Sequence, residues 1–187
     1  MAGDQPTDTS KVWLAPKDPT TQTPQALKNA LPPHAFTGFY IMYPDDDRSP
    51  AERGLVSTVS VDPPMLNWIY VDRDTLEIKY GNRTQSIQHI VGSWDWTEDE
   101  EGVTLDGWEG FAAVDEGERK DGLRWALYYD RWDDDFGAGR KVGGKTRLQC
   151  SLERRILPEE MRRQQEEEAD KKMQVKSTGD LKTKWEV

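Results

Sequence analysis

The sequence predicts a mainly β protein in which about eight antiparallel strands close into a single barrel. Apolar and polar residues alternate along several short segments, as they do in half-buried strands. Turn residues separate these segments, and no helical pattern lies between them. Such short connections favour antiparallel pairing, and eight strands suffice to close a barrel around side chains or one small ligand. A two-sheet β-sandwich is the alternative.

The clearest strand signal is a hairpin that pairs residues 66–72 with residues 76–81. In its second arm Leu76, Ile78 and Tyr80 alternate with charged residues, which is the pattern of a strand with one buried face. The other segments with a strand pattern are residues 38–43, 55–61, 86–96, 103–108, 110–114, 123–130 and 146–152. Residues 133–144 are rich in Gly and Asp and predict a loop.

Two helices are expected outside the sheet. Residues 24–31 follow Thr23, a capping residue, and begin with Pro24, which suits the first helical position. Residues 158–176 carry Glu early and Lys late, in the order that the helix dipole favours. Their apolar stripe is thin, so this second helix is expected to project into solvent.

Three regions follow from this pattern. Residues 1–23 predict a flexible N-terminal arm, in which the apolar patch at residues 12–14 is expected to dock onto the domain. Residues 24–157 predict the barrel domain with its short leading helix. Residues 158–187 predict a charged helix and a disordered tail.

The formal net charge of −10 lies entirely in residues 39–150, which hold 23 acidic and 13 basic side chains. Such a domain repels the phosphates of nucleic acids and the surface of anionic membranes. No apolar run approaches the roughly 20 residues that a membrane helix needs. The charge instead suits a basic protein surface, although solubility alone also explains it.

The only cysteine is Cys150, so an intramolecular disulfide is excluded. This suits a reducing compartment, and residues 1–10 lack the basic and apolar regions of a signal peptide. A cytoplasmic location is therefore expected. Cys150 falls on the apparent core face of its strand and is expected to be unreactive.

Aromatic residues provide the main candidate for a ligand site. Trp94, Trp96, Trp108, Trp125 and Tyr129 fall on predicted strands within one stretch of the chain. If their side chains line the barrel, they form a wall for an apolar, planar or cationic ligand. The alternative is that they simply fill the core.

Two polar residues are further candidates. His89 is the candidate general base, and its alternative role is that of a neutral, hydrogen-bonded core histidine. Arg124 is a candidate partner for a carboxylate on a ligand, or for a neighbouring acidic residue.

Cofactor and metal motifs are not found in the sequence. Two distant histidines and one cysteine make no zinc pattern, and Asp45–Asp47 and Asp133–Asp135 lack the spacing of a calcium-binding loop. The chain has no phosphate-binding loop, dinucleotide fingerprint or nucleophile elbow. No cofactor and no metal are therefore expected.

One short motif resembles a known family. Gly92-Ser93-Trp94 is similar to the Gly-x-Trp of lipocalins, which are small ligand-carrying barrels of the calycin shape. Lipocalins place this motif near their first strand, whereas here it follows several strands. The resemblance therefore assigns no role to any residue.

Three functions are compatible with these features. The first is a non-enzymatic binding protein that holds a small apolar or aromatic molecule or presents acidic loops to a protein. The second is a cofactor-independent enzyme, such as an isomerase or cyclase, with His89 or a carboxylate as proton shuttle in a Trp-lined cavity. The third is a scaffold protein that engages partners through its N-terminal arm and C-terminal helix. Of these we favour binding.

Overall fold

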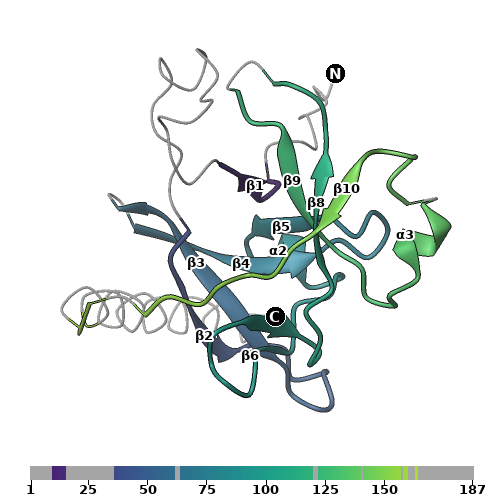
Figure 1. The fold of residues 1–187 in the computed structure, drawn as a ribbon. Helices are drawn as coiled ribbons and strands as arrows, with labels where there is room; N and C mark the ends of the chain where they lie inside the picture. Colours follow the sequence, from purple (N-terminus) through teal and green to yellow (C-terminus); the bar gives the residue numbers. More distant parts are fainter. Residues whose placement is uncertain are drawn as a thin grey trace, which may run out of the picture.

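The computed structural model describes residues 10–15, 36–61, 64–119, 122–139, 141–156, 158–159 and 163. Most regular structure in this part of the chain is antiparallel β-strand, as the sequence predicts. The described strands form three sheets and no closed barrel (Figure 1). The single eight-stranded barrel of lipocalin shape is therefore not what this structure shows.

The first sheet has the strand order β2-β3-β4-β5. Its strands are β2 (Gly38–Met42), β3 (Arg53–Val61), β4 (Pro64–Val71) and β5 (Ile78–Gly81). Each strand follows its predecessor in the chain, so the sheet is a meander of consecutive antiparallel neighbours. These strands correspond to the first four that the alternation predicts.

The turn between β4 and β5 is built around Asp72. Its Oδ1 accepts hydrogen bonds from the backbone N–H groups of Asp74 (3.0 Å) and Thr75 (3.1 Å), and its Oδ2 accepts one from Lys79 Nζ (2.7 Å). Burial opposes ionisation of Asp72, but the hydrogen bonds from Lys79 and the two backbone groups outweigh it and lower its pKa to about 2. Ionised Asp72 therefore stabilises this turn through an ion pair and two hydrogen bonds to the backbone.

The second sheet has the order β1-β9-β8-β10. Its strands are β1 (Trp13–Leu14), β8 (Phe111–Asp115), β9 (Trp125–Tyr129) and β10 (Arg147–Gln149). β1 confirms that the apolar patch near the N-terminus docks onto the same chain, because Trp13 pairs with Ala126. The third sheet is a hairpin of β6 (Trp94–Trp96) and β7 (Val103–Leu105).

The strand predicted over residues 86–96 is wrong except at its end. A one-turn helix, α2 (Arg83–Ser86), ends inside it, and the chain becomes a strand only at β6. The cause lies just upstream. Asn82 Oδ1 accepts the N–H of Gln85 (3.0 Å), and Gln85 Oε1 accepts the N–H of Asn82 (2.9 Å), which forms a capping box. The reciprocal cap makes a helical turn where the apolar alternation indicates a strand.

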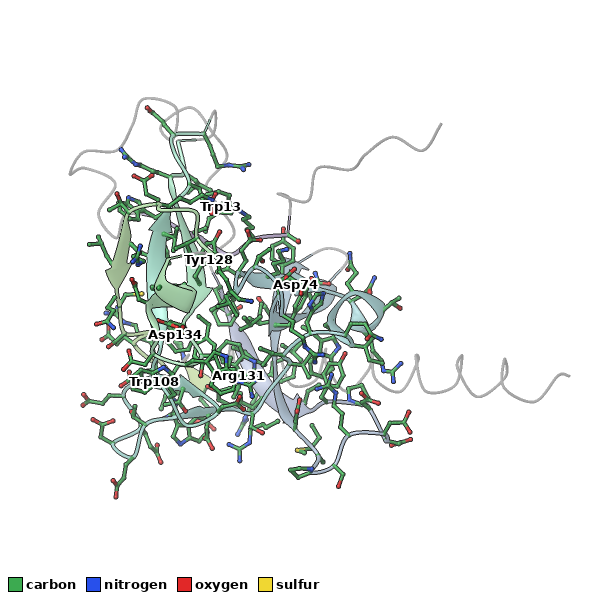
Figure 2. All side chains as sticks on the ribbon, turned by 90° about the vertical axis from the view of Figure 1, so that its right-hand side faces the viewer. Trp13, Asp74, Trp108, Tyr128, Arg131 and Asp134 are labelled. Atoms are coloured by element: carbon green, nitrogen blue, oxygen red, sulfur yellow. The ribbon has the colours of Figure 1, made fainter. Side chains whose placement is uncertain are left out.

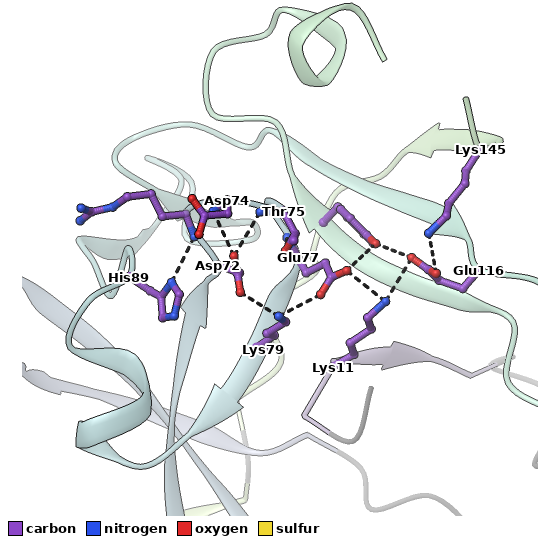
Figure 3. A network of polar contacts seen from close by, with 11 residues as sticks. Lys11, Asp72, Asp74, Thr75, Glu77, Lys79, His89, Glu116 and Lys145 are labelled. Atoms are coloured by element: carbon purple, nitrogen blue, oxygen red, sulfur yellow. Dashed lines mark hydrogen bonds and ion pairs between the residues drawn. The ribbon is translucent and has the colours of Figure 1, made fainter. Parts of the chain in front are cut away.

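A half-buried ionic network joins the first two sheets (Figure 3). Lys11 Nζ lies 3.1 Å from Glu77 Oε1 and 3.3 Å from Glu116 Oε1, and these three side chains are only 10 to 13% exposed. The Tyr128 hydroxyl lies within hydrogen-bond distance of both carboxylates and can donate its one proton to either of them. Burial and the two carboxylates raise the pKa of Tyr128, so its hydroxyl keeps its proton. Lys79 extends the network by pairing with Glu77.

Beside a small buried cluster of Tyr43, Tyr70 and Val91, the described residues form one main hydrophobic core. Its buried members come from both large sheets and from the β6–β7 hairpin, and they include Val71, Ile78, Trp94, Leu105, Phe111, Val114 and Tyr129. The segment α3 (Asp135–Ala138) is a four-residue turn whose φ values are all positive, from 55° to 69°, and it adds Phe136 to this core from within the segment predicted as a loop.

Several predictions fall outside the described residues. These are the helix over residues 24–31, most of the N-terminal arm, and the helix over residues 158–176 apart from residues 158, 159 and 163. They remain predictions.

Candidate functional site

The larger candidate site is a cleft of about 620 Å³ beside β8 and β10. Its apolar lining comes from Phe111 and Phe136, which are buried, and from Trp108, which is 40% exposed. Acidic, basic and amide side chains complete the lining, namely Asp130, Asp133, Asp135, Lys145, Arg147 and Gln149. Apolar walls with a few converging polar groups are typical of ligand sites, whose volumes run from about 300 to 1,000 Å³.

Trp108 is fixed in place by the backbone around it. Its indole Nε1 donates to the backbone carbonyl of Asp130 (3.0 Å). The backbone of Trp108 is held in a tight turn by two hydrogen bonds to Leu105. The N–H of Trp108 donates to Leu105 O (3.1 Å), and the N–H of Leu105 donates to Trp108 O (3.0 Å). Asp106 and Gly107 form this turn with φ values of 53° and 74°. The exposed indole is therefore pre-oriented.

Gly110 leaves the space that the indole fills. A Cβ atom at this position would lie 2.0 Å from Trp108 Nε1 and 2.5 Å from Asp130 O, which are the two atoms of the hydrogen bond. Contacts this short do not occur between real side chains. Glycine at position 110 is thus a condition for the observed position of the indole.

Arg147 and Asp135 face each other in the cleft. The Arg147 guanidinium donates through Nε and Nη2 to the two carboxylate oxygens of Asp135, so the pair forms a fork. The Arg147 hydrogen bonds lower the pKa of Asp135, which stays ionised at neutral pH. Lys145 is held in the same way by Glu116, with Nζ 2.7 Å from Oε2. Both basic groups of this cleft therefore occupy defined positions.

Asp130 differs from these paired groups. Its Oδ2 accepts the backbone N–H of Phe136 (3.3 Å), whereas its Oδ1 is buried and has no hydrogen-bond partner among the described residues. Burial raises the pKa of the Asp130 carboxyl above its usual range. Asp130 therefore lines the cleft with one carboxyl oxygen bonded to the backbone and the other buried.

A second cleft of about 470 Å³ lies on the other side of Trp108. Its lining includes two indoles and four carboxylates but no lysine or arginine. The ten lining residues are Ser93, Asp95, Trp96, Thr97, Glu98, Thr104, Asp106, Gly107, Trp108 and Glu109. Two of the carboxylates are neutralised from outside the cleft, because Arg53 pairs with Asp95 and Arg131 pairs with Asp106. Figure 2 labels Trp108 and Arg131 in the lower half of the view and Trp13 in the upper half.

The predicted aromatic wall is divided between the core and the surface. Trp94 and Tyr129 are 1% and 0% exposed, and both contact Phe111. The Tyr129 hydroxyl also donates to Leu105 O. These two side chains pack the core, in agreement with the alternative reading of the sequence. Of the predicted aromatic residues, only Trp108 and Trp96 line a cleft that opens to solvent.

Trp96 and Trp125 are half-buried, and arginines cover them. Arg154 places its guanidinium 4.2 Å from the Trp96 ring centre, and Tyr40 contacts the same indole at 5.2 Å between ring centres. Arg124 lies 5.9 Å from the Trp125 ring. These contacts are cation–π interactions within the protein.

Arg124 already has an acidic partner. Its Nε and Nη2 donate to the two oxygens of Asp115 over 2.8 and 2.5 Å. The hydrogen bonds from Arg124 lower the pKa of Asp115 to about 2. Pairing with a neighbouring carboxylate is the second role that the sequence suggests for this arginine.

His89 lies outside both clefts. It follows the helical turn α2 and stacks on Tyr70 with 5.1 Å between ring centres. Its Nδ1 accepts the backbone N–H of Arg73 (3.2 Å), as Figure 3 shows. The predicted placement of His89 on a strand over residues 86–96 is therefore wrong, because this stretch becomes a strand only at β6.

Asp130, Asp135 and Arg147 were not identified from the sequence as site residues. Asp135 was considered only as part of an acidic loop, and the other two carry no local motif. A fork between β10 and a residue 12 positions earlier in the chain is a tertiary contact. One feature of the sequence could have indicated this site. The charged residues Asp135 and Arg147 lie in the predicted Gly-rich loop over residues 133–144 and in the predicted strand that follows it.

The described part of the chain also bears on metal binding and on membrane helices. No group of three or more His, Cys, Asp or Glu side chains there is arranged to hold a metal ion. None of its helices has the length and apolar character to cross a membrane.

Comparison with known proteins identifies the family. The family model of the fungal β-trefoil domain matches residues 7–158, which covers the described sheets and both clefts. No curated protein and no solved structure gives a significant match. Because the family model spans most of the sequence, the chain belongs to the fungal β-trefoil domain family.

Proposed function

We propose that this protein is a non-enzymatic binding protein and that it binds a saccharide in the cleft beside Trp108. The β-trefoil is often a binding fold of the lectin type, which gives the general direction. The position of the site and the class of ligand are argued from the cleft itself. A pyranose ring has one face of C–H groups and a rim of hydroxyls, so it needs an aromatic surface beside polar side chains.

The observation that carries the proposal is the fixed, exposed indole. Trp108 keeps 40% of its surface exposed although its Nε1 is tied to the backbone of Asp130. An aromatic surface in a fixed orientation loses little conformational entropy when a ligand stacks on it. The polar rim beside it comprises Arg147, Gln149 and Asp133, which together offer both donors and acceptors to hydroxyls.

An apolar ligand enclosed by the tryptophans is less well supported. Trp94 and Tyr129, which such a ligand would need to contact, are packed against Phe111 in the core. The cleft that does open to solvent is lined by four carboxylate or guanidinium side chains. Those groups would lose hydration against an apolar molecule without gaining hydrogen bonds, which is costly.

Binding is also favoured over catalysis. His89, the candidate base, lies outside both clefts. Asp135, which faces the larger cleft, has both oxygens engaged by Arg147. Asp130 has one oxygen bound to the Phe136 N–H and the other buried. A proton shuttle needs an accessible oxygen or nitrogen within reach of the substrate, so these three groups are poorly placed for that role. The remaining carboxylate of the larger cleft, Asp133, is assigned to hydrogen bonding with hydroxyls.

The direct test is calorimetric titration of the full chain with neutral oligosaccharides of the cello, malto and chito series. We expect at least one series to bind, and Trp108→Ala to weaken that binding more than about tenfold, as loss of a stacking aromatic does at other binding sites. Trp132→Ala is the matched control, since Trp132 is 70% exposed and lines neither cleft. Equal losses in the two variants, or binding of apolar dyes but of no saccharide, would contradict the proposal.

A further inference from the structure

Trp108 lines both of the clefts described above. It belongs to the lining of the larger cleft, of about 620 Å³, and to that of the smaller one, of about 470 Å³. Each of these volumes falls by itself in the range of small-molecule sites. A ligand that stacks on Trp108 and extends beyond it therefore enters the neighbouring cleft.

We infer that the ligand is an oligosaccharide that crosses Trp108 and occupies both clefts, with units free of negative charge in the smaller one. This inference rests on the proposed function and adds the length and the charge of the ligand. It assigns the smaller cleft as a second subsite of one binding surface.

The geometry around Trp108 supports a continuous surface. After β7 the chain turns at Asp106 and Gly107, and Trp108 follows this turn. Gly110 then leads into β8. Gly107 has no heavy atom within 4 Å of the position its Cβ would take, so the turn beside the indole is open. The backbone beside the indole therefore leaves room for a ligand that extends past Trp108.

The charges of the two clefts differ, and this difference defines the selectivity. The larger cleft contains the side chains of Lys145 and Arg147 together with carboxylates. The smaller cleft contains four carboxylates and no basic side chain. Arg53 and Arg131 pair with two of the four, while Glu98 and Glu109 have no ion-pair partner among the described residues.

The surplus negative charge acts at short range. At physiological ionic strength two exposed charges still interact over about 8 Å, which is comparable to the width of one sugar unit. A uronic acid in the smaller cleft would therefore be repelled by Glu98 and Glu109, whereas a hydroxyl or an amino group would be accepted. Trp108 supplies the accessible aromatic surface of this cleft, because Arg154 and Tyr40 already contact the Trp96 indole.

Dependence on chain length tests the inference. Calorimetry with chito-, cello- and malto-oligosaccharides of one to six units should show affinity that rises at least about tenfold from the single unit to the hexamer in the series that binds, because linked units bind with a high effective concentration. Affinity that does not depend on length would overturn the inference while leaving a saccharide site at Trp108. Absence of binding in all three series would instead contradict the proposed function.

Charge reversal within the smaller cleft tests its role. With glucosamine oligomers, which are cationic, Glu98→Lys should weaken hexamer binding at least about threefold. Glu118→Lys makes the same charge change at an exposed residue outside both clefts and should have no effect. Equal effects of the two variants, or tight binding of galacturonic acid oligomers by the unmodified protein, would overturn the assignment of the second subsite. Circular dichroism and the melting temperature confirm that both variants are folded.

Discussion

The backbone carbonyl of Asp130 holds the indole of Trp108 by a hydrogen bond of 3.0 Å from Nε1. Asp130, the acceptor, follows directly after β9, and Trp108, the donor, lies in the connection between β7 and β8. The aromatic wall of the site is thus positioned by backbone atoms of two strand connections. No side-chain rearrangement is needed before a ligand can stack on the indole.

The first prediction concerns the space beneath this indole. Gly110→Ala places a methyl group 2.0 Å from Trp108 Nε1, so the indole must move and its hydrogen bond to Asp130 breaks. We expect saccharide affinity to fall at least about tenfold and the free energy of unfolding to fall by about 1 to 3 kcal/mol. Calorimetric titration and urea unfolding measure the two effects.

Gly117→Ala is the matched glycine control. Gly117 has a φ of +82° and no heavy atom near the position of its Cβ, so alanine there meets backbone strain but no clash. This variant should lose about 1 kcal/mol of stability and keep its saccharide affinity. If Gly110→Ala binds as well as Gly117→Ala, the glycine does not position the indole.

The second prediction concerns the network around Lys11. Lys11→Met removes the cation between Glu77 and Glu116, while each carboxylate keeps one other cation, Lys79 and Lys145 respectively. We expect the free energy of unfolding to fall by about 1 to 3 kcal/mol, because breaking an ion pair that is only 10 to 13% exposed from one side is costly even when the remaining cations compensate in part. Chemical unfolding of the full chain measures this loss.

Arg155→Met provides the comparison for an exposed pair. Arg155 and Glu153 are also ion-paired, with side chains that are 66 and 68% exposed. Removing this cation should change the free energy of unfolding by less than about 1 kcal/mol. Similar losses in Lys11→Met and Arg155→Met would show that the network contributes no more than a surface ion pair.

The third prediction concerns acid. The pKa of Asp72 is about 2 in the folded protein and about 3.9 in an unfolded chain. Because the folded value is the lower one, Asp72 stabilises the protein fully above about pH 5, and this contribution disappears as the pH falls through 3.9 towards 2. Solvent partly screens this ion pair, so we expect the ionised Asp72 to contribute roughly 1 kcal/mol to the free energy of unfolding at neutral pH.

The variant Asp72→Asn isolates this contribution. Its free energy of unfolding should lie below that of the unmodified protein at pH 6, and the two should converge between pH 4 and pH 2. Urea unfolding at a series of pH values gives both curves. A difference that stays constant down to pH 2 would mean that the aspartate stabilises the turn without being ionised.

The fourth prediction concerns the fork between Arg147 and Asp135. Arg147→Lys keeps the positive charge in the cleft but cannot donate two parallel hydrogen bonds to Asp135. We expect saccharide affinity to fall by about three- to tenfold and the pKa of Asp135 to rise towards its usual value. Calorimetry and carboxyl-carbon NMR titration follow the two changes. Unchanged affinity would remove Arg147 from the binding surface.

Much of the strand pattern could be predicted from local alternation. Leu76, Ile78 and Tyr80 alternate with charged residues, and β5 lies there as the second arm of a hairpin. The same reasoning failed between Asn82 and β6, where the reciprocal cap of Asn82 and Gln85 stabilises one turn of helix. Apolar residues spaced for a strand cannot reveal a competing side-chain cap.

The arrangement of the strands could not be predicted in the same way. Alternation indicates which face of a strand is buried but not which strand lies beside it. Here β1 reaches β9 across more than 100 residues of sequence, and β10 pairs with β8 rather than with its predecessor β9. These pairings produce separate sheets where consecutive pairing would favour a single barrel.

The site was predictable only in part. Trp108 was singled out from the sequence, but as one member of an aromatic wall that also contained Trp94 and Tyr129. Composition does not distinguish a core tryptophan from a surface one. The distinction comes from the turn at Gly107 and the space at Gly110, which hold Trp108 at the surface.

The most direct test of the central claim is NMR observation of the tryptophan indole N–H groups during titration with oligosaccharides. The chain has eight tryptophans, and the signal that disappears in Trp108→Phe identifies Trp108. We predict that saturating oligosaccharide shifts the Trp108 and Trp96 signals and leaves those of Trp13 and Trp132 unchanged. Shifts at Trp13 or Trp132, with none at Trp108, would contradict a saccharide site at this indole.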